Sequence, residues 1–380
     1  MTARVKVRLL ALLAVGAALF AGCSNTATGP DAGTPIEAVA PILTRTYYMA
    51  ADEIQWDYAP SGINQITGQP FTDEQNVFVQ NGPDRIGKTY IKAQYREYTD
   101  AAFAMLKPIP AKWQHLGIMG PMIRGVVGDS IRIVFKNNLS IPTSLHVHGL
   151  QYVKRFEGAG YADGTGDEGD AIAPGETYTY MYFVAKRSGP SAMDGSSIMW
   201  MYHPHVNEPA DTNAGLVGPI LVTARAWAKP DGSPADVDRE FINVFTVFDE
   251  NSSHYLQQNI DTFCGVPASV NPDDGDFQES NLMHTINGYV YGNLPGLTMR
   301  KGERVRWYLM GMGTEVDLHT PHWHGATVTI MGMRTDVASL LPMSMQVADM
   351  VPDVLGTWLY HCHVNDHIIA GMMAKFTVTN

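Results

Sequence analysis

Cysteine is scarce in this sequence, with only three residues in 380, at positions 23, 264 and 362. A chain of this length with so few cysteines is not a disulfide-stapled scaffold. Charge is sparse as well, because charged residues make up 17% of the chain and acidic residues outnumber basic ones by 38 to 26. The resulting formal charge of −12 argues against a nucleic-acid-binding protein.

A long apolar run is also missing. The start of the chain has three basic residues and then an apolar stretch from Leu9 to Phe20. That stretch is shorter than the ~20 residues of a membrane-spanning helix. Two small residues and Cys23 follow it, a pattern typical of a bacterial lipoprotein signal. We expect residues 1–23 to be that signal and the protein to be exported from a bacterium, as a periplasmic or membrane-anchored lipoprotein.

Cys23 would then begin the mature chain. It either carries a lipid, which would be the protein's only contact with a membrane, or is removed with a conventional signal peptide.

Glycine and proline are plentiful, at 36 and 23 residues, which favours strands and turns over helices. Alternating apolar runs such as 130–135 and 176–183 predict strands, and 380 residues suit two domains. We therefore predict an all-β protein. Its expected parts are a tether at 24–45, a first domain at 46–228, a linker at 229–239 and a second domain at 240–380.

The two predicted domains repeat one another. Residues Trp200–Asn207 align with Trp358–Asn365, and six of the eight positions are identical. The sequence His-Val-His-Gly at 146–149 likewise matches His-Trp-His-Gly at 322–325. Two divergent copies of one β-domain explain both matches.

Ten of the 13 histidines fall into four clusters. These are His146 and His148; His203 and His205; His319, His322 and His324; and His361, His363 and His367. Residues two apart on a strand point to the same face, so each His-x-His pair presents two imidazoles side by side. The clusters predict metal sites, although imidazole alone does not distinguish copper from zinc, iron or nickel.

The cysteine at position 362 selects the metal. Cys362 lies between His361 and His363 and points to the opposite face of the strand, so one tripeptide can connect two metal sites. Two imidazoles, a thiolate and a weak thioether form the ligand set of a blue-copper electron-transfer site. The predicted ligands are His319, Cys362, His367 and Met372. The alternatives are a structural cysteine at 362 and a packing methionine at 372.

The first half lacks this ligand set. At the aligned positions it has Thr143, Pro204, Pro209 and Ala214. We therefore expect the first domain to contribute histidines to a shared cluster but to hold no blue copper of its own.

With these motifs the chain after the tether resembles the multicopper oxidases. The resemblance implies two cupredoxin-like Greek-key β-sandwich or barrel domains, four coppers per chain, and four-electron reduction of O2 to water, with chemistry that belongs to the metals. It assigns His146 and His322 to a type 2 copper. It assigns His148, His203 and His363 to one type 3 copper, and His205, His324 and His361 to the other.

Within that family the second half is similar to ceruloplasmin and hephaestin, in the stretches 248–251, 286–290, 307–313 and 361–367. This similarity implies an Fe(II) site built from Glu279, His284 and Asp366, with Glu315 reaching over from an adjacent domain. Hard carboxylate ligands favour Fe(III), which makes iron easier to oxidise. Otherwise the two glutamates are surface acids, Asp366 orients His367, and His284 is a core histidine.

Several alternatives remain open from the sequence. The donor is Fe(II) or another small reductant, so a laccase-like oxidase of phenols, or of Cu(I) or Mn(II), is the second hypothesis. A copper-sequestering lipoprotein is the third. A copper nitrite reductase is disfavoured because that related family keeps its cysteine in the first domain. We expect Cys264 to serve in packing. The methionines at 331, 333, 343, 345 and 350 either guide Cu(I) or serve as flexible packing, and packing is the favoured interpretation.

Resemblance to two-domain relatives also predicts an assembly. Such relatives form trimers in which the first domain of one subunit meets the second domain of the next. We therefore expect a homotrimer with a copper cluster between subunits, in which Glu315 completes a neighbour's iron site.

Overall fold

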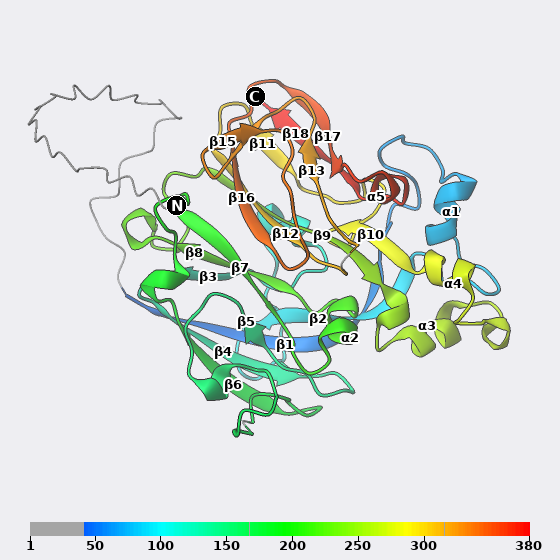
Figure 1. Ribbon diagram of the computed structural model, residues 1–380, viewed down its shortest axis with the longest axis horizontal. Coiled ribbons are helices and arrows are strands. Elements are labelled where there is room, and N and C mark those ends of the chain that lie inside the picture. The colour runs from blue at the N-terminus through cyan, green and yellow to red at the C-terminus, as the bar shows by residue number, and fades with distance from the viewer. Residues whose placement is uncertain (1–41, 167, 315) are drawn as a thin grey trace, which may run out of the picture. The chain divides into compact units, whose positions relative to one another are not determined.

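The computed structural model describes residues 42–166, 168–314 and 316–380 (Figure 1). The predicted signal peptide, Cys23 and most of the predicted tether lie outside the described residues, as does Glu315. None of the helices in the described ranges is both long and apolar enough to cross a membrane.

The first half contains two four-stranded sheets. The order of one is β2-β1-β4-β6 and that of the other is β3-β8-β7-β5. The strands are β1 (Thr44–Asp57), β2 (Thr89–Tyr98), β3 (Ile123–Val126), β4 (Ser130–Asn137), β5 (His146–Val147), β6 (Thr177–Phe183), β7 (Ser197–His203) and β8 (Gly218–Thr223). Alternate residues of β4, including Ile131 and Ile133, share one core cluster with Ile220 and Val222 of β8. The two sheets therefore pack face to face as a sandwich.

The second half also has two sheets, ordered β10-β9-β12-β16-β14-β15 and β11-β18-β17-β13. The strands are β9 (Arg239–Asp249), β10 (Leu282–Ile286), β11 (Thr298–Arg300), β12 (Val305–Gly311), β13 (Pro321–Trp323), β14 (Val328–Ile330), β15 (Met333–Thr335), β16 (Met345–Met350), β17 (Gly356–Cys362) and β18 (Met373–Thr379). Phe241 and Trp307 from the larger sheet pack with Trp323, Tyr360 and Phe376 from the smaller one.

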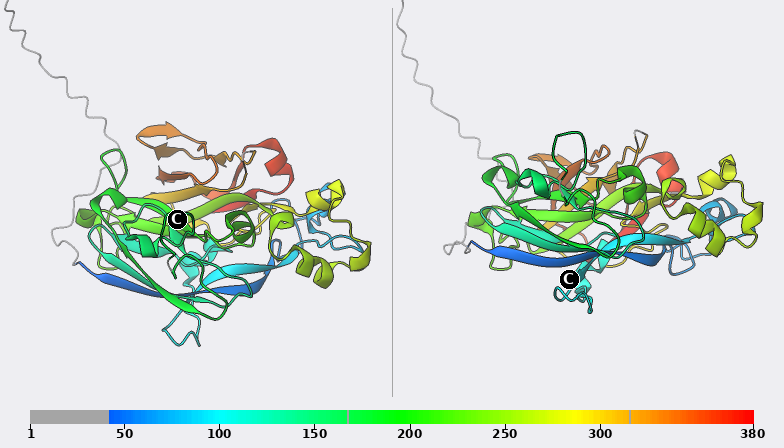
Figure 2. Two further views of the ribbon diagram at one scale, coloured as in Figure 1. Left: turned by 60° about the horizontal axis from the view of Figure 1, so that its bottom comes forward. Right: turned by 90° about the horizontal axis from the view of Figure 1, so that it is seen from below.

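The two halves share one core topology, to which the second half adds β14 and β15. In each, the first long strand pairs in parallel with a later strand, β1 with β4 and β9 with β12. In each, the strand with the second His-x-His motif pairs antiparallel with the strand of the first, β7 with β5 and β17 with β13. Figure 2 shows the early strands (blue to green) and the late ones (orange to red) as separate layers. The all-β prediction is confirmed.

Helices are short and lie between strands. They are α1 (Asp73–Val79), α2 (Glu208–Asn213), α3 (Leu256–Phe263), α4 (Gly275–Ser280) and α5 (Asn365–Ile369). The 3-10 turns are η1 (Ala111–Leu116), η2 (Lys154–Phe156), η3 (Lys186–Ser188), η4 (Arg225–Trp227), η5 (Glu250–Ser252) and η6 (Pro267–Ser269). Helices α2 and α5 occupy matching places, directly after the histidine-bearing strands β7 and β17 (Figure 1).

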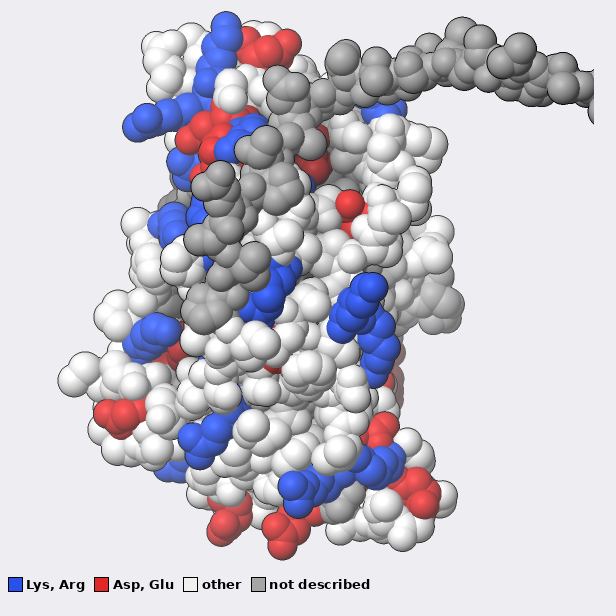
Figure 3. All heavy atoms as spheres, turned by 90° about the vertical axis from the view of Figure 1, so that its left-hand side faces the viewer, with Lys and Arg blue, Asp and Glu red and all other residues white. Residues whose placement is uncertain are grey.

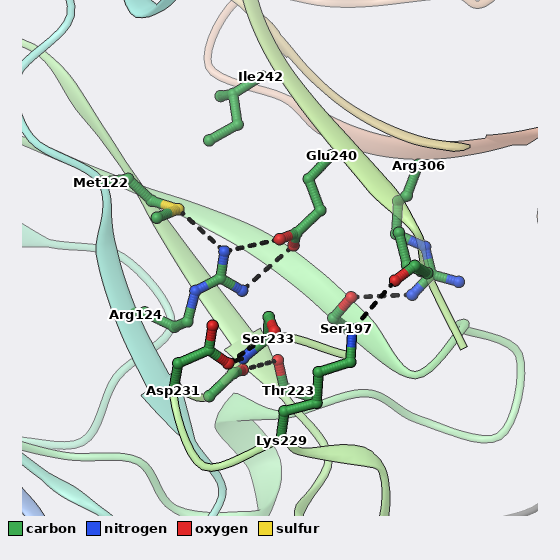
Figure 4. Close-up of polar contacts among 12 residues, drawn as sticks. Met122, Arg124, Ser197, Thr223, Lys229, Asp231, Ser233, Glu240, Ile242 and Arg306 are labelled. Atoms are coloured by element: carbon green, nitrogen blue, oxygen red, sulfur yellow. Dashed lines mark hydrogen bonds and ion pairs between the residues drawn. The ribbon is translucent and has the colours of Figure 1, made fainter. Parts of the chain in front are cut away.

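A polar network joins the halves (Figure 4). The guanidinium of Arg124 in β3 donates two hydrogen bonds to Glu240 in β9, at 3.2 and 2.8 Å. Tyr308 donates to the same carboxylate at 2.9 Å, and Arg306 donates to Ser197 at 2.8 Å. Such bidentate, charge-assisted contacts fix the register between the halves. The exact domain boundaries stay a prediction.

The surface agrees with the modest charge content. On the face in Figure 3, basic and acidic side chains are scattered among uncharged residues.

Candidate metal centre

The first candidate centre lies where β17 ends. Cys362 is the last residue of β17, His367 lies in α5, and His319 precedes β13. The sulfur of Cys362 is 3.5 Å from Nδ1 of His367, and the ligand atoms of all three residues lie within 4.8 Å of one another. All three side chains are buried.

His319 has the tautomer and the protonation state that a metal ligand needs. Nε2 of His319 donates to the carbonyl of Met312 at 2.8 Å, which leaves the lone pair on Nδ1. That Nδ1 is buried and has no hydrogen-bond partner in the described chain, an arrangement that is costly unless a ligand fills it. Burial lowers the pKa of His319 to about 4, so the ring stays neutral at pH 7, as metal binding requires.

Cys362 also fits a metal ligand. Its sulfur accepts a hydrogen bond from the backbone N–H of Thr320 at 3.3 Å. Burial raises the pKa of its thiol, so a bound cation is needed to hold the thiolate at neutral pH. Met372 is fully buried, and its backbone bonds to both Cys362 and His367, at 3.1 and 2.9 Å. The four predicted blue-copper residues therefore meet at one place.

The first histidine quartet consists of His146, His148, His203 and His205. His146 and His203 are cross-strand partners on β5 and β7. Nε2 of His148 lies 2.9 Å from Nε2 of His203. Two nitrogens bound to one metal at roughly 2.0–2.1 Å would lie about 3 Å apart. The backbone carbonyls of Glu157 and Pro204 orient two of the rings through Nδ1, at 2.7 and 2.9 Å.

The second quartet repeats this geometry. It consists of His322, His324, His361 and His363. His322 pairs with His361 across β13 and β17, and Nε2 of His324 lies 3.0 Å from Nε2 of His361. His361 Nδ1 donates to the carbonyl of Cys362 at 2.6 Å. The quartet is therefore one residue away from the cysteine centre but on the other face of β17.

The two quartets stay apart within one chain. Ring contacts of 4.9–5.4 Å join members of the second quartet, and contacts of 5.1–6.1 Å join members of the first. Among the described residues, no ring contact connects one quartet to the other. Each predicted type 2 or type 3 set mixes both quartets, so one chain alone does not assemble it.

An acidic pocket of about 670 Å³ adjoins the cysteine centre. Its lining includes Glu208, Asp249, Glu279, His284, Asp317, Asp366 and His367. The ring of His284 lies 5.2 Å from that of His367. His284 Nδ1 donates to the carbonyl of Leu282 at 2.9 Å. In the neutral ring Nε2 therefore carries no hydrogen, and its lone pair can accept a hydrogen bond or bind a metal. Burial lowers the pKa of His284 to about 4, which keeps it neutral.

The pocket therefore brings together three of the four predicted iron residues, namely Glu279, His284 and Asp366. Sequence reasoning missed Glu208, Asp249 and Asp317. Asp317 stands two residues before His319 and Glu208 three after His205, but acids at such positions carry no signal until the fold brings them to one cavity.

The first-half counterpart of the cysteine centre offers no ligand set. Thr143 and Ala214 are fully buried there. The Oγ1 of Thr143 has no hydrogen-bond partner in the described chain. A hydroxyl and a methyl group do not replace imidazole and thioether ligands.

Comparison with known proteins identifies the class. Two family models, both described as multicopper oxidase, match residues 116–226 and 262–380, which together make up more than half of the chain. Solved structures share the fold: a multicopper oxidase has a TM-score of 0.55 at 19% identity, with 89% of each chain covered. A copper nitrite reductase from Nitrosomonas europaea has a TM-score of 0.54 at 18% identity, covering 89% of this chain and 94% of its own.

Curated relatives are more similar in sequence. The chain is 43% identical to human ferroxidase HEPHL1 over 344 residues, 43% identical to human hephaestin over 343, and 41% identical to human ceruloplasmin over 337. These alignments cover 89, 88 and 87% of this chain, but 29, 29 and 31% of the relatives. The chain thus spans less than a third of their length.

The chain belongs to the multicopper oxidase family of oxidoreductases, and copper is the metal that this family implies. Among its members it is similar to ceruloplasmin and hephaestin. The predicted family, fold and enzyme class are confirmed.

Proposed function

We propose that this protein is a ferroxidase, which oxidises Fe(II) one electron at a time and passes the electrons to O2. Four Fe(II), one O2 and four protons would yield four Fe(III) and two waters. The single observation that carries the proposal is the acidic pocket beside the cysteine centre. Its Glu279, Asp366 and His284 offer two hard oxygens and one imidazole next to His367.

Copper, when bound, supplies the one-electron transfer and the reduction of O2. We propose four coppers per chain, with His319, Cys362, His367 and Met372 holding the type 1 copper. The unpaired Nδ1 of His319 and the raised thiol pKa of Cys362 support this choice. Because Cys362 and His361 adjoin along β17 and face opposite sides, the backbone between them would offer electrons a direct covalent path between the sites.

The remaining copper ligands are proposed to come from both quartets. His146 and His322 would hold the type 2 copper. His148, His203 and His363 would hold one type 3 copper, and His205, His324 and His361 the other. Because the quartets do not meet within one chain, we propose a homotrimer in which the first quartet of one subunit faces the second quartet of the next. Glu315 would then reach a neighbour's iron pocket.

Export from a bacterium, as a periplasmic or lipid-anchored protein, is likewise part of the proposal. A cell-surface or periplasmic site would give the enzyme direct access to O2 and to extracytoplasmic iron. Labelling with a lipid precursor in the native host, with Cys23→Ala as the control, tests the anchor.

The ferroxidase proposal is tested on copper-loaded protein with Fe(II) and a phenol as donors. We expect rapid Fe(II) oxidation with O2 uptake, and about a tenfold lower kcat/KM for Fe(II) in Glu279→Ala, because a substrate ligand is lost. Glu176→Ala, which removes an exposed carboxylate from a turn, serves as the matched control.

The outcomes separate the three hypotheses. Turnover of the phenol without Fe(II) oxidation would favour a laccase-like enzyme. Full copper loading with no O2 uptake from any donor would favour copper sequestration. Equal losses in Glu279→Ala and Glu176→Ala would remove the pocket from the mechanism.

A further inference from the structure

Five described carboxylates line the acidic pocket: Glu208, Asp249, Glu279, Asp317 and Asp366. No described residue of its lining is Lys or Arg. Several negative charges without a matching cation repel one another, and a bound divalent cation relieves that repulsion.

Two of these carboxylates are already engaged. Asp249 accepts hydrogen bonds from the backbone and side chain of Asn251 and from the hydroxyl of Ser252. Asp317 accepts from the backbone N–H and hydroxyl of Thr314. These bonds hold the loops that border the pocket.

The other three carboxylates are not held by hydrogen bonds. Within the described chain, Glu208, Glu279 and Asp366 accept no hydrogen bond through their side-chain oxygens. They come from α2, α4 and α5, so three separate helices each present to the same cavity one carboxylate that accepts no hydrogen bond.

His284 independently indicates a cation ligand. Its side chain is only 7% exposed, and it lines the pocket. Because its Nδ1 is bonded to Leu282, the bare Nε2 has no hydrogen-bond partner in the described chain. An imidazole nitrogen without a hydrogen-bond partner, on a largely buried ring beside carboxylates that accept no hydrogen bond, completes a donor set for a divalent transition metal.

Glu208 differs from the other two in its origin. It lies in the first half, at the start of α2, and Pro209 and Thr212 of the same helix also line the pocket. Its carboxylate is 3.6 Å from Nε2 of His205 and 3.8 Å from Nδ1 of His203. The residue therefore stands between the pocket and the first quartet, so two roles have to be distinguished.

We propose that Glu208 is a cation ligand of the acidic pocket, contributed by the first half, and that it favours divalent metal donors over organic donors. The donor-selecting part of this inference rests on the proposed ferroxidase function. A third hard carboxylate increases the affinity for the cation and favours the higher-charged Fe(III) product. A neutral phenol gains nothing from that charge.

Donor selection is measured with Glu208→Gln, which keeps the size of the side chain and removes its charge. In copper-loaded protein we expect the ratio of kcat/KM for Fe(II) to kcat/KM for a phenol to fall about tenfold, mainly through the KM for Fe(II). The control Glu176→Gln should leave this ratio at the wild-type value. An equal loss with both donors would place the effect of Glu208 on His203 and His205 and overturn the inference.

Cation binding is measured separately, by calorimetric titration of the copper-loaded protein with Zn(II), which is redox-inert. We expect Glu208→Gln to weaken the pocket's Zn(II) affinity about tenfold and Glu176→Gln to leave it unchanged. Unchanged Zn(II) binding in Glu208→Gln would overturn the assignment. If the wild type oxidises a phenol but not Fe(II), the ferroxidase proposal fails, while the Zn(II) titration still decides whether Glu208 is a cation ligand.

Discussion

At the scale of single residues, Cys362 is the position on which the whole arrangement depends. Its sulfur faces His319 and His367. Its neighbour His361 belongs to the second quartet and points to the other side of the strand. Alternation along β17 produces this split, because successive side chains on a strand point to opposite faces. One residue thus joins the cysteine centre to the second quartet.

Replacing this cysteine should remove the metal from the cysteine centre without removing it from the quartets. We expect Cys362→Ser to bind one copper fewer per chain, to lose the blue absorption band and to oxidise no donor, because a hydroxyl is a poor ligand for the type 1 copper. The quartets should keep their coppers. Copper counting, the visible spectrum and O2 uptake measure these effects.

Cys264 provides the matched control. It is the other cysteine in the described chain, and it packs in a core cluster with Phe277 and Tyr90. Cys264→Ser should keep the blue band and four coppers. A blue band that survives in Cys362→Ser, or disappears in Cys264→Ser, would contradict the ligand assignment.

At the scale of elements, the turn after the first His-x-His pair of each half explains the repeated sequence. Gly149 and Gly325 have φ values of +71° and +66°. A Cβ on Gly149 would come within 2.2 Å of the Trp200 ring, and one on Gly325 within 2.6 Å of the Trp358 ring. Each Gly–Trp contact joins the two histidine strands of its own half. The repeated glycines and tryptophans therefore serve the same packing contact in both halves.

We therefore expect Gly325→Ala to destabilise the protein by about 2–4 kcal/mol, from backbone strain together with overpacking. Urea unfolding measures the free-energy change. Gly302→Ala is the control, because Gly302 also has a positive φ, +81°, but a Cβ there meets no atom within 4 Å. Equal losses in the two variants would mean that the contact with Trp358 contributes nothing.

Much of this organisation could be predicted from the sequence, and the reason is local. Strand alternation places His361 and Cys362 on opposite faces, and the aligned octets identify equivalent strands. The acidic pocket could be predicted only in part. Glu208 and Asp366 are 158 positions apart and meet only because α2 and α5 face one cavity. The separation of the two quartets also depends on tertiary structure, so it could not be predicted from the spacing of the histidines.

At the scale of the whole molecule, the junction between the halves contains a buried histidine that makes the folding stability depend on pH. His115 of η1 is fully buried there, and its Nε2 accepts the backbone N–H of Ile242 in β9 at 3.1 Å. Its ring also contacts Phe241, with centroids 5.3 Å apart. The neutral imidazole thus holds the first half against strand β9 of the second half, and a proton on Nε2 would remove the hydrogen bond.

Burial lowers the pKa of His115 to about 4, from an ordinary value near 6.5. Between these values the unfolded chain binds the proton and the folded chain does not. The stability that this residue contributes is therefore complete above pH 6.5 and decreases as the pH falls toward 4, by about 3 kcal/mol in total.

We expect His115→Gln, which keeps an acceptor for Ile242 but cannot titrate, to lose less stability than the wild type as the pH falls. Urea unfolding of copper-loaded wild type and variant at pH 7.5, 6 and 5 measures the difference, since bound copper keeps the ligand histidines from titrating. If the two proteins lose stability in parallel across this range, the acid sensitivity of the junction does not come from His115.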